Sequence, residues 1–181
     1  MTRILLDVDG VIADLVGDLC SELRAVGYRR QPEDVTTYEF QHALPRDELA
    51  VVRGAMVRPG FVASMSWYPG AREFVRELQR LGEVVAVTKP FATSPTWAYE
   101  RAVWLGRNIE KVVQTAHKEL VGGDFLIEDC VANAHTWRHA HPGGHAILLQ
   151  RPWCDVHRLD MPLMGATSYE AVLETIRCLS A

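Results

Sequence analysis

Residues 3–14 read RILLDVDGVIAD, and this stretch decides how the rest of the chain is interpreted. Residues 3–8 form a short apolar run that ends in acidic residues, which is typical of a buried parallel strand with polar groups at its carboxyl end. Asp7 and Asp9 are two residues apart, so their side chains share one face of an extended segment. Two close carboxylates repel each other and require a cation or a shared proton. Mg²⁺ suits such oxygen ligands and also binds phosphate, although DxDG occurs in turns and calcium-binding loops as well.

Strands and helices alternate along much of the chain. Further strands are predicted at residues 83–88, 111–114, 124–127 and 146–149. Apolar residues at helical spacing predict helices at residues 12–26, 46–57, 71–81, 97–105, 131–139 and 169–179. Such alternation builds an α/β, Rossmann-like fold, here a parallel five-stranded sheet with helices on both faces. Residues 28–66 do not follow the alternation and are interpreted as an insertion.

The predicted strands end in polar residues that can act together. In a parallel sheet, ligands bind at the carboxyl ends of the strands. The first strand ends at Asp7 and Asp9, the second at Thr88, and the fourth at Glu128 and Asp129. We therefore expect the chemistry of the protein to lie where these three strands end.

The composition argues against several classes of partner. The formal net charge is −4, so the chain lacks the broad positive field that binds long nucleic acids or anionic membranes. The four cysteines form no CxxC pair, which disfavours structural disulfides and zinc and favours a reducing compartment. The N-terminus has no signal-peptide apolar region, and no apolar run reaches the ~20 residues that span a bilayer. We expect a cytoplasmic protein, and a small phosphorylated substrate is compatible with its charge.

Four ordered motifs resemble the signatures of the haloacid dehalogenase superfamily. They are DVDGVIAD at residues 7–14, Thr88 after VVAV, Lys118, and the acidic pair in FLIEDC. Lys118 lies ten residues before Glu128, a spacing typical of this group. The resemblance implies a Mg²⁺-dependent phosphatase. Asp9 favours phosphoryl transfer over dehalogenation, because dehalogenases need no acid–base group two residues after the nucleophile.

The resemblance also implies a role for each motif residue. Asp7 would attack phosphorus and form an aspartyl-phosphate, and Asp9 would protonate the leaving oxygen and then activate water. Thr88 would donate hydrogen bonds to the phosphoryl group, and Lys118 would supply positive charge to nucleophile and phosphate. The implied metal ligands are Asp7, Asp9 through its backbone carbonyl, and Asp129, with Glu128 acting through a metal-bound water.

Within the superfamily, the chain most resembles the 5′(3′)-deoxyribonucleotidases. The resemblance covers RPGFVASMSWYPGAREFVRELQRLG, WAYERAVWLG and LLQRPW in addition to the four motifs. It implies a haloacid dehalogenase-like core formed by residues 1–14 and 67–181, with residues 15–66 as a small helical cap. The cap would close over a nucleoside and shield the aspartyl-phosphate from bulk water.

The chain departs from that family on the substrate side. Leu15 stands where the family usually has an aromatic residue, and Lys89 stands where it often has serine. Because both positions would affect the substrate, the preference for a base is left open. Lys89 and, by analogy with the family, Phe61 are expected to contact the substrate.

A nucleotidase for (deoxy)nucleoside monophosphates is one of several hypotheses. A phosphatase or mutase for another small phosphoester, such as a sugar phosphate, would use the same motifs. A catalytically idle phosphoester-binding protein would have no use for the acid–base group at Asp9. An end-healing phosphatase for nucleic acid termini would need a basic surface. A homodimer formed through an exposed face of the cap also remains open.

Overall fold

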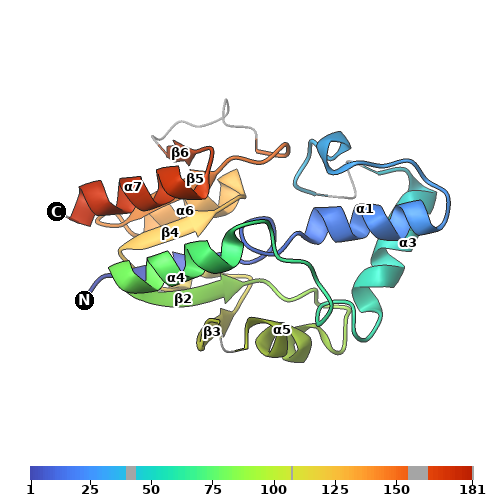
Figure 1. Cartoon of the computed structure of the whole chain (residues 1–181), viewed down its shortest axis with the longest axis horizontal. Helices are drawn as coiled ribbons and strands as arrows, with labels where there is room; N and C mark the ends of the chain where they lie inside the picture. Colours follow the sequence, from blue (N-terminus) through green and yellow to red (C-terminus); the bar gives the residue numbers. More distant parts are fainter. Residues whose placement is uncertain (40–43, 107, 155–162, 181) are drawn as a thin grey trace.

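The centre of the protein is a parallel β-sheet. The computed structural model describes residues 1–39, 44–106, 108–154 and 163–180. Within these residues the sheet has six strands in the order β3-β2-β1-β4-β5-β6, and all neighbouring pairs are parallel (Figure 1). The strands are β1 (Arg3–Leu6), β2 (Glu83–Thr88), β3 (Lys111–Gln114), β4 (Phe125–Glu128), β5 (His145–Leu149) and β6 (Met164–Ala166). The expected α/β class is confirmed.

The expectation of five strands is wrong because it omits β6. This strand has only three residues, reads Met-Gly-Ala and pairs with β5 alone, at the edge of the sheet. So short an edge strand, with a glycine at its centre, shows neither an apolar run nor an alternating pattern. The other five strands lie where they are predicted, with ends that differ by at most two residues.

The helices follow the predicted pattern closely. They are α1 (Leu15–Ala25), α3 (Arg46–Val57), α4 (Ala71–Leu81), α5 (Trp97–Leu105), α6 (Val131–Ala140) and α7 (Tyr169–Ser180), with the 3-10 helices η1 (Pro32–Asp34) and η2 (Lys118–Leu120). In the part of the chain that the structure describes, no helix combines the length and apolar character needed to span a membrane.

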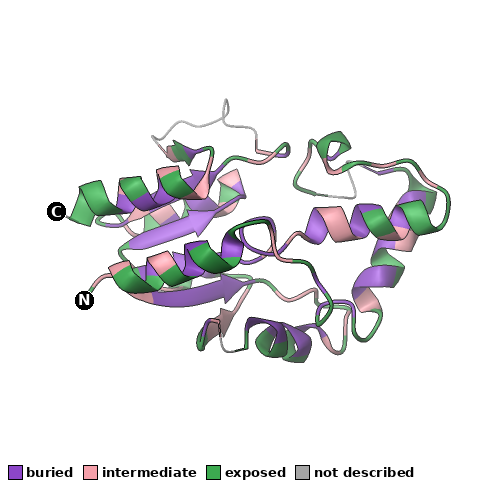
Figure 2. Cartoon of the chain, viewed as in Figure 1, coloured by how far each residue is buried: buried purple, intermediate pink, exposed green. Residues whose placement is uncertain are grey.

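The sheet has a hydrophobic core on each of its faces. Ile4 and Leu6 of β1 belong to the larger hydrophobic cluster, to which α4 and α7 contribute. Leu5 points to the opposite face and belongs to a second cluster, which contains Trp137 of α6. Figure 2 shows the buried strands between helices whose outer sides are exposed. Because the side chains on both faces of β1 are buried, the strand is a continuous apolar run.

The helices α1 and α3 lie beyond the carboxyl ends of the strands, at the opposite end of the molecule from the two termini (Figure 1). Helix α1 begins at Leu15 and not at the expected Ile12, because residues 8–13 form a compact turn in which the Ile12 N–H donates to the carbonyl of Val8 at 2.9 Å. Asp14 then caps the helix, since its Oδ1 accepts a hydrogen bond from the Gly17 N–H at 2.9 Å.

Candidate active site

Asp7 and Asp9 lie where β1 leaves the sheet. The Asp7 N–H donates to the carbonyl of Ile127 at 2.9 Å, so the backbone is still tied to β4 at this point. The Asp7 side chain is almost fully buried, whereas the Asp9 side chain is 20% exposed. Asp9 ion-pairs with Arg101. Burial raises the pKa of Asp9, and the neighbouring charge of Arg101 counteracts part of that rise.

Gly10 allows the turn after β1 to pack directly against Asp129. Its φ is +78°, and a Cβ at this position would lie 1.8 Å from Oδ2 of Asp129. Any side chain would therefore both strain the backbone and collide with a carboxylate. The glycine of the DxDG motif is thus required by the geometry of the site.

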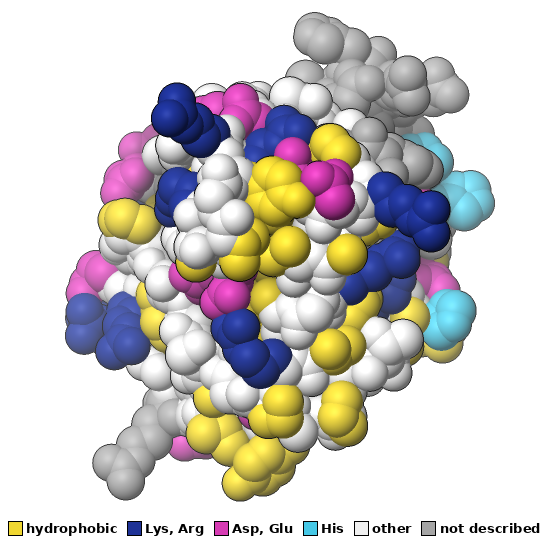
Figure 3. All heavy atoms as spheres, turned by 90° about the vertical axis from the view of Figure 1, so that its right-hand side faces the viewer, with side chains coloured by type: hydrophobic (Ala, Val, Ile, Leu, Met, Phe, Trp, Pro, Cys, Tyr) yellow, Lys and Arg dark blue, Asp and Glu magenta, His cyan; other side chains and the backbone are white. Residues whose placement is uncertain are grey.

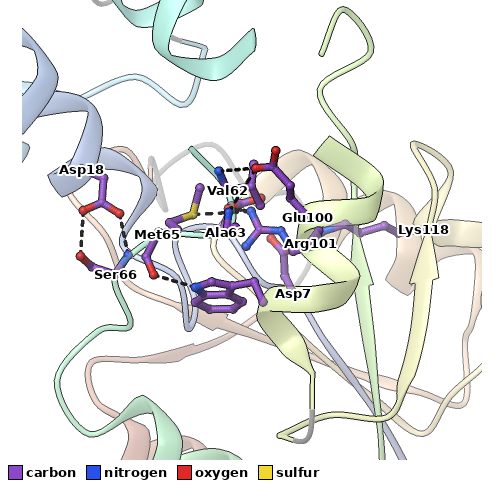
Figure 4. A network of polar contacts seen from close by, with 11 residues as sticks. Asp7, Asp18, Val62, Ala63, Met65, Ser66, Glu100, Arg101 and Lys118 are labelled. Atoms are coloured by element: carbon purple, nitrogen blue, oxygen red, sulfur yellow. Dashed lines mark hydrogen bonds and ion pairs between the residues drawn. The ribbon is translucent and has the colours of Figure 1, made fainter. Parts of the chain in front are cut away.

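Lys118 joins two of the strand ends electrostatically. It is 5% exposed, and its Nζ lies 2.6 Å from Oδ1 of Asp7 and 2.6 Å from Oε2 of Glu128. Burial by itself lowers the pKa of Lys118, but the two carboxylates outweigh it and raise the pKa above its usual value. Lys118 is therefore a permanent cation beside Asp7, and Figure 4 shows it reaching toward that residue.

Asp7, Glu128 and Asp129 form a buried carboxylate cluster. One oxygen from each lies within 4.8 Å of the others. Burial raises the pKa of Glu128 to about 7, and the charge of Asp7 contributes to this rise. Burial likewise raises the pKa of Asp129, again with a contribution from Asp7. Among the described residues, Lys118 is the cation that ion-pairs with these acids, and three acids this close favour a further cation.

The cluster fits a hard metal ion at Asp129. Oδ2 of Asp129 accepts a hydrogen bond from Nε1 of Trp153 at 2.8 Å, but its buried Oδ1 has no hydrogen-bond partner among the described residues. Oxygen ligands of this type are those that Mg²⁺ prefers. Both oxygens of Glu128 are already engaged, by Lys118 and by the Cys130 N–H and the Asn133 amide. The free oxygen therefore belongs to Asp129 and not to Glu128.

The end of β2 adds Thr88 and Lys89. Thr88 is fully buried, and its Oγ1 has no hydrogen-bond partner in the described part of the chain. A buried hydroxyl without a partner costs free energy unless a ligand or water supplies one. Lys89 is exposed and lines the same pocket as Asp7.

A pocket of about 360 Å³ is lined by most of the predicted site residues, but Thr88 and Glu128 are not part of its lining. Its polar floor comes from the strand ends and from η2, and it includes Asp7, Asp9, Lys118 and Asp129. Apolar side chains from α1, α3 and the segment between them face this floor: Leu15, Val16, Val35, Leu49, Val52 and Met56. Figure 3 views this end of the molecule, where hydrophobic, basic and acidic side chains are intermingled.

The expected substrate contact of Phe61 can be compared with the structure. Phe61 is 4% exposed and belongs to the hydrophobic core, and it is not among the residues that line the pocket. Trp97 does line the pocket. Sequence reasoning missed Trp153, which lies in the LLQRPW segment, and Arg101. The available signal for Arg101 was a charged residue on the apolar side of a helix, four residues after Trp97.

The sheet order and the acids at the strand ends define a haloacid dehalogenase-like protein. The structure matches a solved hydrolase of the haloacid dehalogenase-like family from Streptococcus pneumoniae with a TM-score of 0.62, over 97% of this chain and 98% of that chain. Sequence identity in this comparison is 14%, so it establishes the shared fold alone.

The family is identified by the sequence. Residues 1–176 match the family described as 5′ nucleotidase, deoxy (pyrimidine), cytosolic type C protein (NT5C), and the chain belongs to this family. It is 30% identical over 148 residues to the human 5′(3′)-deoxyribonucleotidase, cytosolic type, covering 70% of each chain. A Bordetella parapertussis protein with the provisional name 5′(3′)-deoxyribonucleotidase is 28% identical over 149 residues, 75% of this chain and 80% of its own. The resemblance stated from the motifs is confirmed.

Proposed function

We propose that the protein is a Mg²⁺-dependent phosphomonoesterase that removes phosphate from (deoxy)nucleoside monophosphates through an aspartyl-phosphate. The observation that carries this proposal is the buried carboxylate of Asp7, held 2.6 Å from Lys118 at the floor of a pocket. A paired, oriented carboxylate is suited to nucleophilic attack. Membership of the nucleotidase family supports the reaction class.

In the first step, a carboxylate oxygen of Asp7 forms a bond to phosphorus, and the bond between phosphorus and the substrate oxygen breaks. Asp9 delivers its proton to the departing oxygen, so the nucleoside leaves as an alcohol. Lys118 and the hydroxyl of Thr88 stabilise the negative charge on the phosphoryl oxygens. The unpaired Oγ1 of Thr88 supports this role, because it is buried with no partner in the described chain.

In the second step, Asp9 accepts a proton from water as the water oxygen attacks phosphorus. The bond between Asp7 and phosphorus breaks, which releases inorganic phosphate and restores the carboxylate. The carboxylates of Asp7 and Asp129 and the backbone carbonyl of Asp9 would hold Mg²⁺, with Glu128 beside them. When bound, Mg²⁺ would offset the negative charge that the nucleophile and the phosphate bring together.

The opposite wall of the pocket suits the nucleoside part of the substrate. Residues 15–66 act as a cap in this proposal, and the apolar side chains of α1 and α3 offer contacts to a flat base and a sugar. Lys89, at the pocket edge, is available for a substrate anion. The names of the human and bacterial relatives support a nucleotide substrate, and the human cytosolic relative supports a cytoplasmic location.

The test is phosphate release from a panel of nucleoside 5′- and 3′-monophosphates and sugar phosphates, with Mg²⁺ or with EDTA. We expect Mg²⁺-dependent release from nucleotides and a loss on the order of 10⁴-fold or more in Asp7→Asn, since the nucleophile itself is removed. Release from sugar phosphates alone would refute the substrate class but not the mechanism. A folded protein that turns over nothing in the panel would favour the idle binding protein.

A further inference from the structure

Arg101 is a charged residue in a place where stability does not require one. Its side chain is 0% exposed, and its Nε and Nη1 have no hydrogen-bond partner among the described residues. Burying a guanidinium with unsatisfied N–H groups is costly, and an apolar residue of similar volume is commonly as stable or more so. The guanidinium carbon lies 5.6 Å and 5.2 Å from the ring centroids of Trp97 and Trp104, and such cation–π contacts offset only part of this cost.

The charged contact of Arg101 is with Asp9. Its Nη2 ion-pairs with Oδ1 of Asp9, and the same nitrogen lies 3.6 Å from Sδ of Met65. Asp9 also lines the pocket, and no described residue other than Arg101 forms a side-chain hydrogen bond with it. Oδ1 of Asp9 is thus held by Arg101.

Helix α5 is anchored by hydrogen bonds on both sides of Arg101. Nε1 of Trp104 donates to the carbonyl of Met65 at 2.6 Å. The neighbouring Glu100 accepts hydrogen bonds from the backbone N–H groups of Gly60, Val62 and Ala63 at 2.7, 3.1 and 3.2 Å. Figure 4 shows this network joining α5 to the segment that returns from α3 to the sheet. Because the helix is anchored around Arg101, the ion pair between Arg101 and Asp9 restrains the direction in which the carboxyl of Asp9 points.

We propose that Arg101 is a positioning residue that aims the carboxyl of Asp9 at the leaving oxygen of the substrate. This inference rests on the proposed function. Arginine stays protonated in proteins, so Arg101 transfers no proton itself. Proton transfer by Asp9 requires an oxygen within hydrogen-bond reach of the leaving group, and a misdirected carboxyl loses that contribution. The effect of Arg101 is therefore largest for substrates whose leaving group needs a proton.

The experiment compares esters that differ in their need for acid catalysis. The leaving groups of phenyl phosphate and of a deoxynucleoside 5′-monophosphate are more basic than 4-nitrophenolate, the alkoxide of the nucleotide most of all, whereas the 4-nitrophenolate of 4-nitrophenyl phosphate departs without a proton. The constant kcat/KM is used because it covers the steps up to the first irreversible one, the cleavage of the ester. The variants are Arg101→Met, Arg101→Lys, Asp9→Asn and the double variant Asp9→Asn with Arg101→Met. Arg76→Met, which removes an ion-paired arginine on the surface of α4, is the matched control.

For Arg101→Met, we expect kcat/KM to fall about 10–100-fold for the two esters with the more basic leaving groups and less than about threefold for 4-nitrophenyl phosphate. The loss is smaller than the roughly 10²–10⁴-fold that acid–base catalysis contributes, because Asp9 itself is still present. Arg101→Lys should recover part of the loss. In the Asp9→Asn background, Arg101→Met should add no further discrimination between the esters.

Equal losses on all three esters, or undiminished discrimination in the Asp9→Asn background, would overturn the positioning role and leave the proposed function intact. Turnover of the aryl phosphates but not of the nucleotide would refute the nucleotide substrate and still decide the role of Arg101. An unaltered protein that hydrolyses none of the three would overturn both proposals. Arg101→Lys keeps the charge, so it supplies a folded variant if Arg101→Met is too unstable.

Discussion

The floor and the opposite wall of the pocket are built from opposite kinds of side chain. The floor is a network of charges, in which Lys118 lies between Asp7 and Glu128 with Asp129 beside them. The wall formed by α1 and α3 presents aliphatic side chains such as Leu49 and Val52. Charged, buried groups act strongly because little water screens them, whereas apolar contacts add affinity in proportion to area. Substitutions in the floor should therefore affect catalysis and stability, and substitutions in the wall should affect substrate binding.

The largest effect is expected at Lys118. Lys118→Met leaves two buried carboxylates without their shared cation, so unfolding free energy should fall by about 3–5 kcal/mol. Lys111→Met is the control, because Lys111 also pairs with a carboxylate but is 61% exposed. Exposed pairs contribute about 0–1 kcal/mol. Urea unfolding of the two variants measures the difference, and similar losses would show that burial of the pair is not what matters.

Mg²⁺ should stabilise the floor specifically. A ligand present at about 100 times its Kd stabilises the native state by about 2.7 kcal/mol, which corresponds to about 5–10 °C in Tm for a chain of this size. Thermal unfolding with Mg²⁺ and with EDTA gives the shift. Asp129→Asn should abolish it, because the carboxylate with the free oxygen is neutralised. Glu73→Gln, on the surface of α4, should retain it. A shift that survives in Asp129→Asn would place the ion elsewhere.

A substitution in the apolar wall should raise KM. Leu49→Ala removes aliphatic surface from the pocket, and such losses weaken binding by about 1–3 kcal/mol, so a rise of about tenfold in KM is expected. The constant kcat should change little, because the lost contact serves ground state and transition state alike. Leu179→Ala, on the exposed side of α7, is the control. A fall in kcat at constant KM would contradict the division between floor and wall.

The smallest effect is expected at Lys89, an exposed residue of the pocket lining. An exposed charge contributes about 0–1 kcal/mol, so Lys89→Met should raise KM by at most about fivefold. Salt screens such interactions, and the difference between variant and unaltered protein should shrink as NaCl is added. Steady-state kinetics at low and high salt provide the measurement. A difference independent of salt would mean that Lys89 acts through packing.

The acids of the pocket floor could be predicted from the sequence, whereas the residues that contact them, Trp153 and Arg101, could not. Asp7, Thr88 and Asp129 follow apolar strands, and the rule that parallel strands end at one edge brings them together. Lys118 was identified only by resemblance, since a lone lysine in a short 3-10 helix has no distinctive pattern. Trp153 and Arg101 come from segments far along the chain, and their contacts with Asp129 and Asp9 depend on packing that periodicity does not encode.

The fold shows the same division between local and long-range information. Helices α3, α4 and the strands β2 and β3 have the predicted ends, because apolar periodicity and the flanking glycines and prolines are local signals. Strand β6 depends on its pairing with β5, and the start of α1 depends on the backbone hydrogen bonds of the turn at residues 8–13. Phe61 illustrates the limit of analogy, because its side chain fills the core.

The tryptophans around the pocket allow the site to be studied by intrinsic fluorescence. Trp97 and Trp153 line the pocket, Trp104 stacks on Trp67 with ring centroids 4.1 Å apart, and Trp104 also contacts Arg101. Indole emission responds to nearby charge and to water, and Trp153 donates a hydrogen bond to the carboxylate that would receive the cation. The unmodified protein thus carries its own fluorescent reporters, through which ion and ligand binding can be followed without any turnover and in variants that have lost their activity.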